Sequence, residues 1–127
     1  MIATASPMRE KFAGITDTES FGYCLRDFLD RFRENPSYDL IAEEPEMLDP
    51  QLKDNGRADA FLASTAAYLA LKHQFPVPRW ASGNSRALEK PWFAAKTHNL
   101  RMILLQESPA AFRVRNLFVS ANALSRA

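Results

Sequence analysis

The sequence is poor in the residues that build disulfides, metal centres and phosphate-binding loops. A single cysteine, Cys24, occurs among 127 residues, so neither an internal disulfide nor a thiolate zinc site is expected. The two histidines, His73 and His98, lack the i, i+4 spacing that places two metal ligands on one helix face. The four glycines are not spaced as in a phosphate-binding loop. We therefore expect no metal and no cofactor.

Long apolar runs are also missing. No apolar stretch approaches the ~18 residues of a membrane-spanning helix. The opening MIATASPMREKFAG has neither the basic start nor the apolar core that a secretory signal peptide carries. These features, together with the single cysteine, predict a soluble protein of the cytoplasm with no membrane contact.

Aromatic residues are plentiful instead. Nine phenylalanines, three tyrosines and two tryptophans bring large apolar areas, which argues against disorder and for one well-packed core. A chain of this length fits a single domain.

The spacing of apolar residues predicts an all-α fold. Residues 21–33 place phenylalanines and leucines on one face of a helix, with Ser20 as its cap. The longest helix is expected over 56–74, capped by Asp54 or Asn55. It is apolar or small nearly all round, as in the central helix of a bundle.

The C-terminal third predicts three further helices. Residues 98–107 are apolar on most sides, which predicts a buried helix. Ser108 is expected to cap a short helix over 109–115. An extended segment over 117–119 and a last helix capped by Ser120 follow.

Proline-rich stretches complete the predicted architecture. Residues 1–16 are expected to be a loose N-terminal leader, and 17–127 a single helical domain. Ser37 is expected to cap a short helix that extends through Ile41 and Ala42. Residues 76–95 have no sustained period and predict a long connecting strap that bears both tryptophans, with one helical turn near 84–89. No β-sheet pattern is found, so we expect an irregular bundle of five or six helices.

Charge is divided unevenly along the chain. Residues 1–60 hold thirteen acids and seven bases, a net −6, and residues 61–127 hold two acids and nine bases, a net +7. The two halves could neutralise each other across the fold, form an acidic and a basic face, or support head-to-tail self-association.

No catalytic constellation is found. Glu43, Glu44 and Glu46 could offer a carboxylate pair, but they fall on a turn that is expected to be solvated. Cys24 lies on the apolar face of its predicted helix and is expected to be inert. An enzyme is therefore not expected.

The strap supplies the first candidate interaction residues. Arg79 and Trp80 follow a Pro-Val-Pro motif, and Lys90 precedes Pro-Trp-Phe with Trp92. Tryptophan beside cationic residues is typical of protein-binding hot spots, and indoles also stack on single-stranded bases. The alternative is that both indoles are buried beneath the strap with their N–H groups paired.

Arg113 and Arg115 are the second candidate pair. Two residues apart on a helix, they point about 200° from each other, so they cannot form one arginine patch. Phe112 is expected to face the core. This stretch resembles a packing motif with a basic rim more than a DNA-reading helix.

Several motifs together resemble a family of short, largely uncharacterised bacterial proteins. Similar segments also form the tail of proteins that begin with a helix-turn-helix domain. The resemblance implies a gene beside a nucleotidyltransferase-like protein, in the style of toxin–antitoxin pairs, and it implies no catalytic residue. Two departures are expected to matter: no DNA-binding domain is expected in front of this domain, and Val114 stands where relatives are more often basic. The motifs are Phe21-x-x-x-Leu25-Arg26-Asp27-Phe28-Leu29, Glu43-Glu44-Pro45, Pro76-x-Pro78-x-Trp80, Pro91-Trp92-Phe93, Glu107-Ser108-Pro109-Ala110-Ala111-Phe112-Arg113 and Asn116-x-Phe118-Val119-Ser120.

Three functions remain open at this point. The first is a non-catalytic protein-interaction or regulatory domain, antitoxin-like, with a protein partner or self-association. The second is an accessory nucleic-acid-binding protein that uses its exposed bases. The third is an enzyme with a small-substrate pocket under the 76–95 strap, lined by both indoles.

Overall fold

The computed structural model describes residues 6–49, 51–82, 86–95 and 97–120. Within these ranges the fold is mostly helical, with one pair of two-residue strands, which confirms the predicted all-α class. None of the helices in the described ranges is long and apolar enough to cross a membrane. The elements in chain order are α1 Met8–Lys11, α2 Thr18–Glu34, the 3-10 helix η1 Tyr38–Leu40, α3 Arg57–Lys72, α4 Arg79–Ser82, β1 Trp92–Phe93, α5 His98–Glu107, α6 Ala110–Arg113 and β2 Leu117–Phe118.

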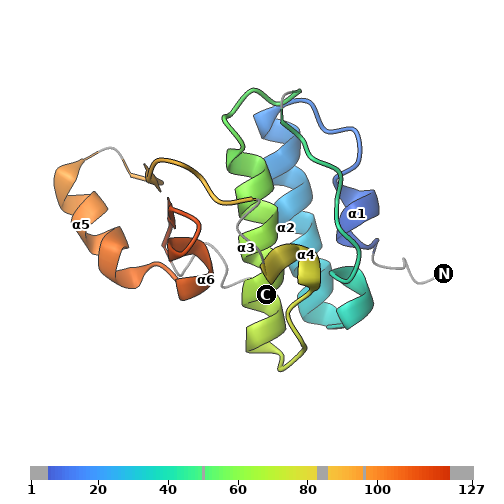
Figure 1. Cartoon of the computed structure of the whole chain (residues 1–127). Coiled ribbons are helices and arrows are strands. Elements are labelled where there is room, and N and C mark those ends of the chain that lie inside the picture. Colours follow the sequence, from blue (N-terminus) through green and yellow to red (C-terminus); the bar gives the residue numbers. More distant parts are fainter. Residues whose placement is uncertain (1–5, 50, 83–85, 96, 121–127) are drawn as a thin grey trace.

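Helix α3 is the centre of the bundle, as its composition predicts. Eleven of its sixteen residues are buried, and alanines on its surface let α4 and α6 approach closely. Helix α2 lies beside it (Figure 1). The ring of Phe21 meets that of Phe61 at 6.3 Å and the ring of Phe32 meets that of His73 at 5.2 Å, so the two helices run in the same direction.

Two aspartates begin the main helices. The Asp17 carboxylate accepts the N–H of Ser20 at 2.7 Å, so α2 starts at Thr18 and the prediction that Ser20 is its cap is wrong. The cap position of α3 is Gly56, so neither Asp54 nor Asn55 occupies it as predicted, although the Asp54 carboxylate accepts the N–H of Ala58 at 2.8 Å. With seventeen residues against sixteen, α2 and not α3 is the longest helix.

The N-terminal segment is packed rather than loose over its described part. Met8 and Phe12 are buried, and the ring of Phe12 lies 5.4 Å from that of Phe21. Lys11 pairs with Asp27 at 2.5 Å and ties α1 to α2. A four-residue helix is too short to show a period, which is why the sequence predicts a leader here. Residues 1–5 lie outside the described ranges.

The strap contains a helical turn and a strand. Its turn is α4, at Arg79–Ser82, and not near 84–89: residues 86–89 are not helical, and 83–85 lie outside the described ranges. Strand β1 pairs in parallel with β2, Trp92 opposite Leu117 and Phe93 opposite Phe118. The extended segment over 117–119 is therefore confirmed, whereas its partner strand was not predicted.

Ser108 joins the end of α5 to the residue after β2. Its hydroxyl donates to the carbonyl of Leu104 at 2.6 Å and accepts the N–H of Val119 at 2.8 Å. The prediction that Ser108 caps the next helix is wrong, because α6 begins after Pro109 without a side-chain cap. The last predicted helix, after Ser120, falls outside the described residues.

Candidate interaction site

Trp80 fastens the strap to the body of the protein. Its indole N–H donates to the carbonyl of Ile41 at 2.9 Å, and the guanidinium carbon of Arg86 lies 5.1 Å from the centre of its ring. The residue is half-buried. These contacts agree with the alternative in which an indole is held beneath the strap with its N–H paired.

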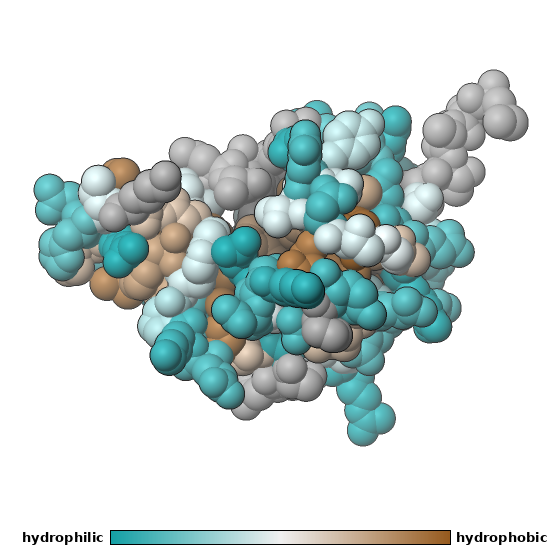
Figure 2. Space-filling view, turned by 90° about the horizontal axis from the view of Figure 1, so that it is seen from above, coloured by the Kyte–Doolittle hydropathy of each residue, from teal (hydrophilic) through white to brown (hydrophobic). Residues whose placement is uncertain are grey.

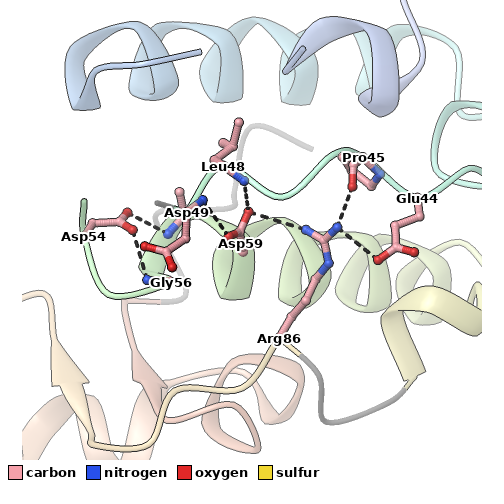
Figure 3. A network of polar contacts seen from close by, with 9 residues as sticks. Glu44, Pro45, Leu48, Asp49, Asp54, Gly56, Asp59 and Arg86 are labelled. Carbon is pink, nitrogen blue, oxygen red and sulfur yellow. Dashed lines mark hydrogen bonds and ion pairs between the residues drawn. The ribbon is translucent and has the colours of Figure 1, made fainter. Parts of the chain in front are cut away.

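Arg86 is the hub of a polar network that fixes residues 44–49 against α3 (Figure 3). Its side chain is 1% exposed. One terminal nitrogen donates to Glu44 at 3.1 Å and to the carbonyl of Pro45 at 2.5 Å, and the other lies 3.7 Å from Asp59. Glu44 therefore has a structural partner, whereas the sequence predicts only a solvated corner.

Asp59 is a structural carboxylate rather than a catalytic base. One of its oxygens accepts the N–H of Leu48 at 2.7 Å and the other accepts the N–H of Asp49 at 3.1 Å. Both oxygens are thus engaged by backbone N–H groups, and the residue is 1% exposed. The sequence signals this network only through Asp59, a lone acid in the apolar stretch of α3. Arg86 and Glu44 are 42 residues apart, so no local pattern links them.

Trp92 and Lys90 lie on a groove. It has a volume of about 720 Å³ and runs between the turn before α3 and the residues that lead into β1. Arg57 stacks on the Trp92 ring with its guanidinium carbon 4.7 Å from the ring centre. The lining includes Trp92 but not Trp80, so it differs from the pocket lined by both indoles that an enzyme under the strap would need.

The two arginines near α6 differ in environment. Arg113 is exposed, whereas Arg115 is 5% exposed. Arg115 donates to the carbonyl of Ala111 at 2.7 Å and to that of Ala81, and burial lowers the pKa of its guanidinium. Its selection as a candidate surface residue conflicts with this burial. Phe112, one residue before Arg113, faces the core as predicted.

The six candidate residues thus do not form one surface. Lys90 and Trp92 meet at the groove, Trp80 is held against the body, and Arg115 is inside. Arg79 and Arg113 are exposed, on α4 and α6.

Helix α5 exposes several large apolar side chains to solvent. Its bounds are those predicted, but its burial is not: Leu104 alone is buried. The other large apolar side chains are 40–51% exposed. In Figure 1 the helix stands at one end of the molecule, and Figure 2 shows apolar residues at that end. The exposed side chains are Leu100, Met102, Ile103 and Leu105.

Few contacts hold α5 to the rest of the chain. It packs against β2, and the guanidinium carbon of Arg101 lies 5.6 Å from the ring centre of Phe93, which in turn stacks on Phe118 at 4.7 Å. Thr97 caps its first turn by accepting the N–H of Leu100 at 3.3 Å. The helix therefore contacts the rest of the described chain on one side only, and the apolar side chains on its other sides are exposed to solvent.

Neither metal ligation nor known relatives add to this site. In the described ranges, no group of three or more His, Cys, Asp or Glu side chains is placed to hold a metal ion. Comparison with protein-family models, curated proteins and solved structures finds no match.

Proposed function

We propose that this chain is a non-catalytic protein-interaction domain and that α5 is its interaction element. The observation that carries the proposal is the exposure of four large apolar side chains on one ten-residue helix. Apolar groups concentrated in this way are typical of surfaces that a second molecule covers.

The small amount of tertiary packing on α5 supports the same proposal. A helix of this length is marginal in water, and tertiary packing normally supplies what local propensity does not. Here Leu104 alone is buried within the helix. Cover from another molecule would supply the missing burial of Met102 and Ile103.

The narrower role we propose is that of an antitoxin-like or regulatory partner of a neighbouring gene product. This role rests on the resemblance to bacterial proteins of toxin–antitoxin-like loci. Arg101 on α5 and Arg113 on α6 are exposed, and such cations would favour an acidic surface on the partner and raise its association rate.

Affinity purification from the native host tests the function. The tagged chain is expressed beside an untagged copy, the extract is treated with nuclease, and retained proteins are quantified by mass spectrometry. We compare the native sequence, a Met102→Ser/Ile103→Ser double variant, and Leu71→Ser as a control that removes an exposed leucine from α3, 65% exposed against 46–47% for the α5 pair.

The proposal predicts a stoichiometric protein that the native and Leu71→Ser chains retain and the α5 variant loses. That protein is either another gene product or the untagged copy. Equal recovery from all three chains contradicts it. Recovery of nucleic acid alone from untreated extract, lost with rising salt, would favour the nucleic-acid alternative instead.

A further inference from the structure

We draw no further inference here: the strongest candidate, the exposed apolar face of α5 at one end of the molecule, carries none because nothing in the structure shows what covers it.

Discussion

Three oxygens converge on the guanidinium of Arg86, and together they decide where residues 44–49 lie. The side chain is buried. It donates to Glu44 and to the carbonyl of Pro45, and Asp59 forms an ion pair with it at 3.7 Å. Arginine suits this position because its planar fork reaches several acceptors at once. A buried cation of this kind is costly to desolvate, so its partners matter more than those of a surface ion pair.

We predict that Arg86→Met destabilises the fold by about 2–4 kcal/mol, measured by urea denaturation. Asp59 keeps its two backbone N–H donors in this variant, so the loss should stay below the upper range for a broken buried pair. Glu44→Gln is the matched control. Its side chain is 53% exposed, and the variant should lose less than about 1 kcal/mol. Equal losses in the two variants would contradict the role of Arg86 as the hub.

Ser108 is the second residue whose single side chain joins distant segments. In Ser108→Ala the buried N–H of Val119 loses its acceptor, and we predict a loss of about 1–3 kcal/mol. Ser82→Ala removes an exposed hydroxyl that bonds only the Arg79 carbonyl, and it should stay within about 0.5 kcal/mol of the native chain. Thermal or urea unfolding of both variants gives the comparison, and a neutral Ser108→Ala would exclude a structural role for this hydroxyl.

At the scale of elements, the stability of the first turn of α2 is expected to depend on pH. Hydrogen bonds from Ser20, first its backbone N–H and then its hydroxyl, lower the pKa of Asp17 below its ordinary value. A group whose pKa falls on folding stabilises the folded state above its unfolded pKa. That contribution is lost as pH falls through the folded pKa. We predict that the first turn of α2 frays in that acid range.

Carbon-13 NMR of the Asp17 carboxyl group, titrated from neutral to acid pH, measures this prediction. The midpoint should lie below that of an unstructured aspartate, and the Ser20 amide signal should move with the same midpoint. Asp17→Asn keeps a capping oxygen and removes the titration, so its Ser20 amide should no longer follow pH with that midpoint. An ordinary midpoint for Asp17 in the native chain would contradict the cap.

The sequence predicts where a helix begins and ends better than it predicts which other segments the helix packs against. The bounds of α5 follow from its run of apolar residues over 98–107 and from the Ser108-Pro109 signal after it. Its burial does not follow, because an apolar composition states what a helix can pack against and not whether the chain supplies it. Strand β1 escaped prediction because two residues show no period, and its pairing depends on Leu117, far along the chain.

At the scale of the whole molecule, the candidate site depends on contacts between segments far apart in sequence. Lys90 and Trp92 were selected from composition, and the structure places them at a groove whose other wall, with Met47 and Arg57, no local pattern indicates. Arg115 was selected for its charge, and its burial depends on the carbonyl of Ala81, 34 residues away. Local sequence reports residue type and helical face, whereas exposure is decided by tertiary packing.

The segment with β1, α5, α6 and β2 is joined to the body mainly where α6 meets α3. Phe112 is fully buried there, with its ring 5.2 Å from Phe61 and 6.5 Å from Tyr68. We predict that Phe112→Ala lowers the free energy of unfolding by about 3–5 kcal/mol, because a large ring leaves a cavity between the two parts. The loss should appear in the unfolding of the whole chain, since both parts share this contact.

Phe93→Ala is the matched comparison. Phe93 is half-exposed and stacks on Phe118 beside α5, away from the α3–α6 contact. Its removal should speed amide hydrogen exchange in α5 with little change in exchange of α3, whereas Phe112→Ala should speed exchange in both. If Phe112→Ala instead affected α5 and α6 alone and left α3 protected, the two parts would fold independently, and α5 would then be carried by a unit that does not need the central helix.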